Sequence, residues 1–377
     1  MKNDPFEKYY TEQEPGKKML GYIWQTAIGL QAVDGLSTSA YLIDTARQNI
    51  EGEITLKQAN ERITAYYEER EKHTSPKEEE ADKVSARISQ VLSESGFVFS
   101  PVQYLSIHEK LFRGLYDHAG EIRDYNISKK EWVLNGASVQ YGGAAELRAT
   151  LQYDFEQEKA FQYQGLSLTD IIRHIALFVS RLWQIHVFGE GNTRTTAVFL
   201  IMYLRSLGFD VTNDVFAENA WYFRNALVRA NYNDLKNGIR ETIVYLEMFL
   251  RNLLLGEKHA LRNRDLHVGG TTIKQDIDGE KQNIGPIKQD IDGEKQDIEA
   301  VFPYDDALKR MNVSVKTTAH VLKMYQTFGK TAAFGRSNVC ELLGITASPA
   351  STLLKKLLET GIITLVTGLG KGKYRFI

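Results

Sequence analysis

The sequence predicts a mainly α-helical protein that contains one β-hairpin and ends in a small winged-helix domain. Three observations support this prediction. Apolar residues recur at helical spacing through most of the 377-residue chain before position 257. Within residues 132–141, strand-forming residues flank an Asn-Gly pair, which is the strongest short-range signal for a hairpin. Residues 305–377 combine helical patterns with two strand patterns around a glycine-rich turn.

Composition and charge exclude several classes of protein. The formal net charge of −2 gives no global field that would attract nucleic acid or an anionic membrane. The one cysteine, Cys340, excludes an intramolecular disulfide and a cysteine-based metal cluster. The N-terminus lacks the apolar core of a signal peptide, and the longest apolar run, 197–204, is too short to span a bilayer. We therefore expect a soluble cytoplasmic protein without a membrane partner.

Residues 1–83 are predicted to form an N-terminal helical module. A first helical pattern breaks at Asp34-Gly35, and a second ends at Glu51-Gly52, where glycine suits a left-handed helix end. Thr55 and Gln58 stand three residues apart and predict the capping box of a third helix.

Residues 84–256 are predicted to form a helical bundle around the hairpin. The predicted helices cover residues 84–92, 104–115, 167–185, 192–208, 215–232 and 238–256. The patterns at 167–185 and 192–208 carry wide apolar stripes, which places both helices at the centre of the bundle.

The remaining sequence divides into a linker and a C-terminal domain. Residues 257–304 are polar and contain a ten-residue sequence, 273–282, that recurs at 287–296. Two copies are too few for a solenoid, so this part is interpreted as a linker between domains. Residues 305–377 predict three helices followed by a two-stranded wing, which is the pattern of a winged helix.

The chemistry of the chain is concentrated at residues 186–194, between the two most apolar helices. Gly189 and Gly191 let the backbone turn sharply and approach a ligand closely. The helix that begins near Asn192-Thr193 presents unpaired N–H groups and the positive end of its dipole, so this stretch predicts an anion cradle. Arg194 can add a bidentate contact to phosphate oxygens.

Two further side chains suggest a reaction rather than binding alone. Glu190 suits Mg²⁺, because that ion takes one or two protein carboxylates and completes its shell with phosphate oxygens and water. The unperturbed pKa of a histidine lies near neutral pH, so His186 is the natural general base for a substrate hydroxyl. Together these groups predict the transfer of part of a Mg-nucleotide to a protein or small-molecule hydroxyl.

The stretch resembles the signature of the Fic domain, His-x-Phe-x-(Asp/Glu)-Gly-Asn-Gly-Arg-x-x-Arg. The matching positions are His186, Phe188, Glu190, Gly191, Asn192 and Arg194. The similarity extends over roughly 95–255 and implies a helical Fic-type bundle. Fic proteins mostly transfer AMP from ATP to Ser, Thr or Tyr hydroxyls of target proteins, so the resemblance implies an AMP-transferring enzyme that uses ATP and Mg²⁺.

The resemblance implies a role for each matching residue. His186 would deprotonate the target hydroxyl, Glu190 would hold Mg²⁺, and Phe188 would anchor the loop in the core. The residues expected to bind the nucleotide are Gly189, Gly191, Asn192, Thr193 and Arg194. The 132–141 hairpin would be the flap that registers a target segment by strand addition. The residues expected to dock the target are Val133, Leu134, Ser138 and Val139.

Two positions depart from the signature. Thr193 stands in place of the third glycine, and Ala197 in place of the final arginine, which in the family orients the γ-phosphate. The loss of that arginine is shared with the Doc branch, in which the γ-phosphate itself is transferred. Doc-like phosphoryl transfer therefore remains an alternative to AMP transfer.

The N-terminal module resembles the inhibitory, antitoxin-like segment of Fic proteins, whose signature is (Ser/Thr)-x-x-x-Glu-(Gly/Asn). Glu51-Gly52 fits its end, whereas Arg47 occupies the Ser/Thr position. Glu51 is therefore a hypothetical autoinhibitory residue, and the alternative is a plain helix-end glutamate.

A function of another class also remains open, namely a DNA-binding regulator that acts through the tail. Residues 301–377 carry eleven Lys/Arg and four Asp/Glu, so this end is basic although the whole chain is not. The expected DNA contacts are Ser351 and Lys355 on a recognition helix and Lys371 and Lys373 on the wing. The same domain could instead bind a protein, and an oligomer is compatible with the sequence.

Overall fold

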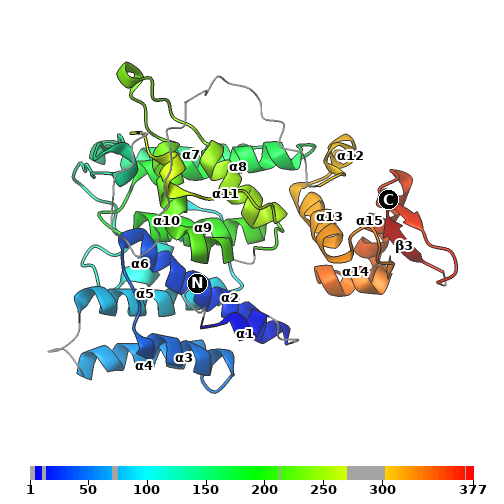
Figure 1. The fold of residues 1–377 in the computed structure, drawn as a ribbon, viewed down its shortest axis with the longest axis horizontal. Helices are drawn as coiled ribbons and strands as arrows, with labels where there is room; N and C mark the ends of the chain where they lie inside the picture. Colours follow the sequence, from blue (N-terminus) through cyan, green and yellow to red (C-terminus); the bar gives the residue numbers. More distant parts are fainter. Residues whose placement is uncertain (1–4, 11–13, 70–74, 212–213, 270–301, 370) are drawn as a thin grey trace, which may run out of the picture.

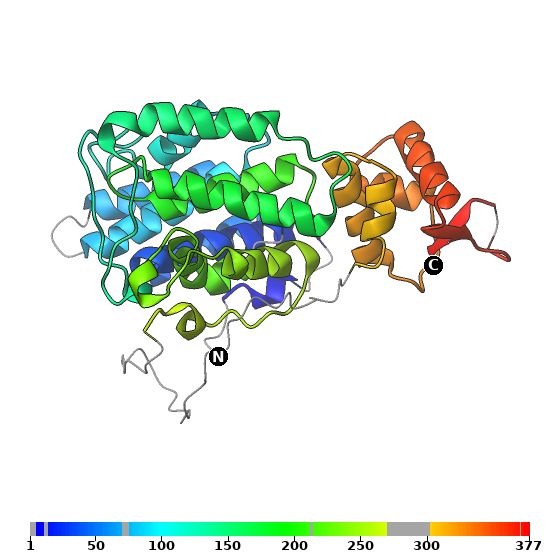
Figure 2. The ribbon, with the colours of Figure 1, turned by 90° about the horizontal axis from the view of Figure 1, so that it is seen from above.

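The computed structural model describes residues 5–10, 14–69, 75–211, 214–269, 302–369 and 371–377. These residues form a helical body and a smaller C-terminal unit at one end of it (Figures 1 and 2). The predicted mainly α-helical class is confirmed, and the described strands form one small antiparallel sheet in the C-terminal unit. In the described part of the chain, no helix is both long and apolar enough to cross a membrane.

The N-terminal part of the body consists of helices that pack around their own small core. Its elements are α1 (Glu7–Tyr10), α2 (Pro15–Gly29), the 3-10 helix η1 (Leu30–Asp34), α3 (Ala40–Ile50), α4 (Leu56–Glu69) and α5 (Pro76–Ser93). The capping box predicted before α4 is confirmed, because Thr55 N–H donates to the side chain of Gln58 and Gln58 N–H donates back to Thr55 Oγ1. Ser39 caps α3 with a single bond, in which its Oγ accepts the N–H of Leu42.

Helix α2 lies between α5 and α10 (Asp214–Arg229) and so joins the N-terminal part to the rest of the body (Figure 1). The approach to α10 is very close, because a Cβ added at Gly29 would overlap the backbone of Ala217. Only glycine permits this separation of the two backbones. The N-terminal part is therefore packed into the fold and is not a detached appendage.

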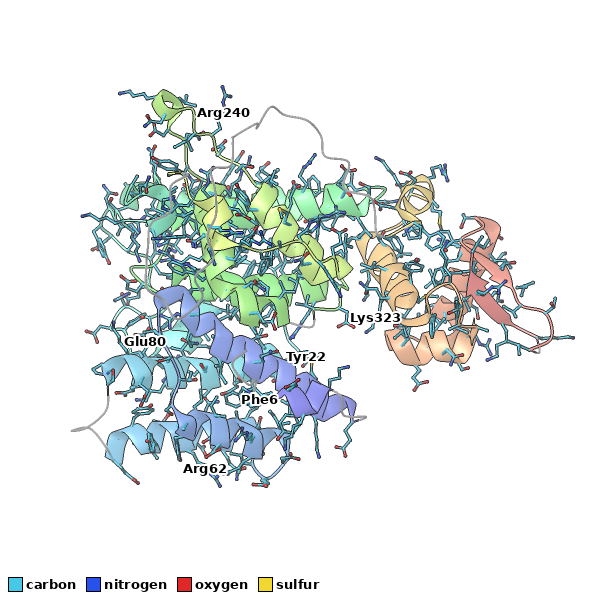
Figure 3. The ribbon with its side chains drawn as sticks, viewed as in Figure 1. Phe6, Tyr22, Arg62, Glu80, Arg240 and Lys323 are labelled. Carbon is cyan, nitrogen blue, oxygen red and sulfur yellow. The ribbon has the colours of Figure 1, made fainter. Side chains whose placement is uncertain are left out.

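The central helices are α6 (Pro101–Phe112), α7 (Leu147–Ala160), α8 (Leu168–Ile185), α9 (Asn192–Ser206) and α11 (Val244–Leu255). Every residue of α9 from Asn192 to Leu204 is buried, as expected for a helix at the centre of a bundle. The prediction for α8 and α9 is thus confirmed. Between α10 and α11 the chain forms a protruding loop, with Arg240 near its tip (Figure 3).

The predicted hairpin at 132–141 is not formed. The chain does reverse at Asn135-Gly136, but Trp132–Leu134 forms the 3-10 turn η2 and the two arms are not paired as strands. The consecutive side chains of Val133 and Leu134 are both buried. A strand with one buried face would alternate them, so burial on successive positions favours the turn.

The residues after α11 pack against this loop. Val268 N–H donates to the Val133 carbonyl over 2.9 Å, and the ring of His267 packs edge-on against Trp132. The part of the predicted linker at 257–269 therefore belongs to the folded body. The two copies of the repeat, 273–282 and 287–296, lie outside the described residues.

The C-terminal unit is built from short helices and a sheet of strand order β1-β3-β2. Its elements are α12 (Asp305–Arg310), α13 (Val315–Phe328), β1 (Phe334–Gly335), α14 (Arg336–Leu343), α15 (Ala347–Glu359), β2 (Ile363–Leu365) and β3 (Lys373–Phe376). The predicted helices and the two predicted strands are confirmed. Strand β1 was missed, because two residues give no periodic signal.

The unit is attached to the body through α12 and α13. Asp305 accepts a hydrogen bond from the N–H of Leu168 at the start of α8, and Gln326 donates to the carbonyl of Leu254 near the end of α11. Lys323 lies at this junction and pairs with Asp210 over 3.1 Å (Figure 3). Helix α15 and the wing strands β2 and β3 are not part of these contacts.

Candidate active site

His186 is the residue at which α8 ends, and it has the left-handed conformation (φ 52°, ψ 55°) usually taken by glycine. Holding a non-glycine residue there costs roughly 1–3 kcal/mol, so the surrounding contacts must offset it. The imidazole is buried and packs against the ring of Tyr141, with 4.2 Å between ring centroids. The left-handed turn thus directs the side chain inward at the start of the 186–191 loop.

The proton of His186 can be placed from its surroundings. Burial, followed by the nearby charge of Lys129, holds the pKa of His186 well below its ordinary value, so the ring is neutral at pH 7. Nδ1 lies 3.3 Å from the Trp183 carbonyl, which can only accept, so Nδ1 carries the proton. Nε2 is buried and has no hydrogen-bond partner among the described residues. Its lone pair is available to take a proton from a substrate.

Two glycines shape the loop between His186 and α9. Gly191 has φ 73°, and a Cβ there would overlap the ring of Phe112. At Gly189 a Cβ would meet the hydroxyl of Tyr125 and the ring of His118. The N–H groups in the first turn of α9 have no acceptor within the helix. The predicted geometry of an anion cradle is therefore present at the start of α9.

The side chains of Asn192 and Thr193 face the protein and not a ligand. Both ends of the Asn192 amide bond the backbone of Phe188, at 3.1 Å and 2.8 Å. Thr193 Oγ1 accepts the indole N–H of Trp183 over 3.0 Å. The Asn192 amide could orient either a phosphate or a backbone, and in the structure it orients the backbone; the Thr193 side chain also braces the loop. What they can offer an anion is their backbone N–H.

His108 packs against the 186–191 loop and holds it in place, a role that was not predicted from the sequence. Its ring stacks on Phe188, with centroids 3.7 Å apart, while Phe188 is itself fully buried. Burial lowers the pKa of His108 to about 3, so the ring is neutral. Nδ1 accepts the Gly120 N–H, which leaves Nε2 to donate to the Glu190 carbonyl over 3.0 Å. A lone histidine in a helical pattern gives no sequence signal for this role.

Glu190 presents its carboxylate to solvent and to one cation. The side chain is 59% exposed and pairs with Lys129 over 3.0 Å. Among the described residues, no group of three or more His, Cys, Asp and Glu could hold a metal ion. A divalent cation here would therefore take Glu190 and the oxygens of a bound phosphate chain, as Mg²⁺ commonly does.

Arg194 is buried and binds the N-terminal part of the chain. Its Nε lies 2.8 Å from Asp34 Oδ2, and its Nη2 lies 2.6 Å from Glu80 Oε1. Nη1 donates to Gln31 Oε1 over 3.0 Å. Asp34 and Gln31 lie on η1 and Glu80 lies on α5 (Figure 3 labels Glu80). The guanidinium predicted to hold phosphate thus donates to Glu80 and Gln31 and forms an ion pair with Asp34, whose carboxylate is close to Nε but not aligned for a hydrogen bond.

Glu51, the predicted inhibitory residue, does not reach this cluster. Hydrogen bonds from Lys8, Tyr9 and Lys17 hold its carboxylate and lower its pKa to about 2. These contacts favour the alternative interpretation of Glu51 as a helix-end glutamate, and the acidic residues at Arg194 are Asp34 and Glu80. The sequence did contain a signal for Asp34, because Asp34-Gly35, like Glu51-Gly52, is an acidic residue followed by a glycine at a helix end.

The residues predicted to dock a target lie mostly inside the protein. Val133, Leu134 and Val139 are at most 3% exposed, so their side chains belong to the core. Ser138 Oγ bonds the backbone of this loop, at Lys129 N–H and the Val139 carbonyl. The carbonyl of Val133 is taken by Val268. The side chains predicted for docking do not form an open surface.

The predicted DNA contacts are accessible but lie on a separate unit. Ser351 and Lys355 are exposed on α15, Lys371 is exposed in the turn between β2 and β3, and Lys373 is half-buried on β3. None of these residues belongs to the 186–194 site.

Residues 98–204 match the family model described as Fic/DOC. The chain carries a Fic/DOC family domain. The matched residues extend from just before α6 through the loop with His186 to the last turns of α9, so the site lies within the Fic/DOC domain. Among solved structures, the chain is similar to a Fic family protein from Desulfovibrio desulfuricans G20. That similarity has a sequence identity of 13% and a TM-score of 0.36, and it covers 94% of this chain and 87% of the other.

Proposed function

We propose that the Fic/DOC domain transfers AMP from Mg-ATP to a hydroxyl side chain of a target protein. The observation that supports this most directly is the neutral, buried His186 next to the glycine loop at the start of α9, whose Nε2 finds no partner in the described part of the chain. A base of this kind accepts the proton of an attacking hydroxyl, while backbone N–H groups and the helix dipole stabilise negative charge on phosphate oxygens.

The proposed step is a single displacement at the α-phosphorus. The target hydroxyl gives its proton to His186 Nε2, its oxygen bonds the α-phosphorus, and the bond to the bridging oxygen breaks to release pyrophosphate. Mg²⁺ bound at Glu190 would neutralise charge on the phosphate chain. Tyr141 keeps the imidazole in place, because Tyr141 is held by the buried carboxylate of Glu131, which pairs with Arg224 over 2.7 Å.

We further propose that the N-terminal part restrains this activity through Arg194. While Asp34 and Glu80 hold the guanidinium, it is not free to bind a triphosphate. Opening of this cluster would both release Arg194 and make room for the nucleotide. This replaces Glu51 by Asp34 as the proposed inhibitory residue.

Radiolabelled ATP tests the reaction. Label from the α-phosphate that stays on protein supports AMP transfer, and label from the γ-phosphate supports the Doc-like alternative. That alternative is favoured by Ala197, which is fully buried and leaves Arg194 as the one cation in the first two turns of α9. His186→Ala should abolish labelling, whereas His320→Ala on α13 should leave it unchanged. Absence of both labels in the chain and in an Asp34→Ala variant would refute the proposal.

A DNA-binding role for the tail is the second proposal. The order α13, β1, α14, α15, β2, β3 is typical of a winged helix, and α15 carries Ser351 and Lys355 on its exposed face. Lys355→Ala with Lys371→Ala should weaken binding of the full chain to duplex DNA and reduce its salt dependence. Lys57→Ala, which changes an exposed lysine on α4, is the control. Equal binding by all variants would contradict this role, and a protein would then be the expected partner.

A further inference from the structure

Arg123 is a buried arginine next to His186, and the reaction proposed above does not use it. It is 6% exposed, and within the described residues no carboxylate pairs with it. Its partners are instead backbone carbonyls. Nε donates to the His186 carbonyl over 2.8 Å, and Nη2 donates to the Gly142 carbonyl over 2.6 Å. Nη1 donates to the carbonyl of Tyr125.

This arrangement is unusual because burial of a charge without an opposite charge is costly. The cost is reduced here by the position of Arg123 at the C-terminal end of α8, where the helix dipole favours a cation. The backbone of Arg123 adds a further bond, since its N–H donates to the Val187 carbonyl over 2.9 Å. Arg123 therefore fixes two successive carbonyls, those of His186 and Val187.

The same guanidinium holds the two ends of the loop around residues 132–141. Tyr125 lies where the chain enters this loop, and Gly142 lies where it leaves. Gly142 runs so close to α8 that a Cβ would come within 2.9 Å of the Ile185 carbonyl. Its neighbour Tyr141 packs on the imidazole of His186. Arg123 thus connects the left-handed turn of His186 to the segment that covers its ring.

We propose that Arg123 is a positioning residue that sets the left-handed turn of His186 and holds the loop 125–142 against it. The proposal rests on the AMP-transfer function proposed for the site. Arg123 does not touch the reacting atoms; it acts through the backbone of His186 and through Tyr141. Its three hydrogen-bonding groups reach three separate carbonyls, so a lysine, which has a single donor nitrogen, cannot replace them.

Besides burial, three cations lower the pKa of His186, and Arg123 is one of them. Lys129 lies in the loop 125–142, Arg224 lies on α10 and pairs with Glu131, and Arg123 precedes that loop. All three cations disfavour the imidazolium. Loss of the charge at Arg123 should therefore raise the titration midpoint of His186, while Arg123→Lys should largely preserve it.

The test compares Arg123→Gln and Arg123→Lys with the matched control Arg205→Gln. Arg205 is half-buried in the last turn of α9, at the opposite end of that helix from the 186–191 loop, and it donates to the Leu92 carbonyl near the end of α5. Misplacement of a catalytic group by about 1 Å costs on the order of 100-fold in rate. We expect both Arg123 variants to lower kcat by about that factor with little change in KM for ATP, and Arg205→Gln to change neither by more than about threefold.

The second readout is the NMR titration of the His186 ring, which does not require turnover. We expect Arg123→Gln to raise the midpoint and Arg123→Lys to leave it near that of the parent chain. An unchanged His186 midpoint in Arg123→Gln would overturn the proposal. So would equal losses of kcat in Arg123→Gln and Arg205→Gln when the two variants lose the same amount of Tm. If Arg123→Gln does not fold, a normal kcat in Arg123→Lys overturns it instead. If the parent chain transfers neither label, the proposed function fails, while the NMR titration still tests the effect of Arg123 on His186.

Discussion

Substitution of Asp34 by Asn should raise the proposed AMP transfer by loosening the cluster around Arg194. The change keeps the size of the side chain and removes its charge from the 2.8 Å contact with Nε. Breaking a buried ion pair costs about 3–5 kcal/mol, but the Asp34 side chain is 35% exposed and Glu80 remains in place. After a discount for solvent screening we expect a loss of about 1–1.5 kcal/mol in the docking of η1.

This loss of docking free energy increases the population of molecules in which η1 is detached from Arg194. If only the opened form binds ATP productively, 1.4 kcal/mol raises its fraction about tenfold. Initial rates of protein labelling from α-labelled ATP should therefore rise about tenfold in Asp34→Asn, and further in Asp34→Asn with Glu80→Gln. The rise should appear mainly in kcat/KM, since the release of Arg194 permits nucleotide binding.

Glu51→Gln is the matched control for this experiment. It removes another charged carboxylate from the N-terminal part, one that pairs with Lys8 and Lys17 but lies away from Arg194. Its labelling rate should equal that of the parent chain. Equal rates for Asp34→Asn and the parent chain, or equal activation by Glu51→Gln, would refute the assignment of Asp34.

Three other predictions follow from the packing of the body. Gly29→Ala should push α2 away from the Ala217 backbone, lower the free energy of unfolding by about 1–3 kcal/mol and raise the labelling rate; an unchanged Tm would contradict it. Thr193→Val should leave the indole N–H of Trp183 unpaired and lower stability by about 1–3 kcal/mol without a large change in KM for ATP, and a selective rise in KM would restore Thr193 as a ligand. The folded-state pKa of His108 lies below its unfolded value, so its stabilising effect is present above pH 6.5 and is lost as the pH falls from 6.5 toward 3. His108→Gln should therefore reduce the dependence of unfolding free energy on pH in that window by about 1.4 kcal/mol per unit, as measured by urea unfolding at several pH values.

Most of the fold could be predicted from patterns among residues that are close in the sequence. The capping box at Thr55 and Gln58, the apolar stripes of α8 and α9 and the order of the C-terminal helices all depend on neighbouring residues, and the structure confirms them. The Asn-Gly turn at 135–136 was also correct as a reversal. The strands around it were wrong because burial of both Val133 and Leu134 depends on the helices packed around the loop.

The candidate site shows the same division. The sequence of the 186–194 loop predicted a base, a metal-binding carboxylate and a glycine cradle from local spacing, and the structure gathers these residues in one loop before α9. It did not identify the partners of Arg194, because Asp34 and Glu80 come from elements far away in the chain. It also did not show that the side chains of Asn192 and Thr193 brace the loop, because their contact with Trp183 and with the Phe188 backbone depends on the folded chain.

The close crossing of α2 and α10 restricts how the sequences of these two helices can evolve. Helix α2 touches α5 on one side and α10 on the other, and the backbone of Ala217 occupies the space that a side chain at position 29 would need. The N-terminal part cannot be exchanged for that of a distant relative without also changing α10. Expressed as two separate polypeptides, the two parts should assemble as one obligate complex. Among relatives, any residue larger than glycine at position 29 should be accompanied by a shift or a shortening of the segment around position 217.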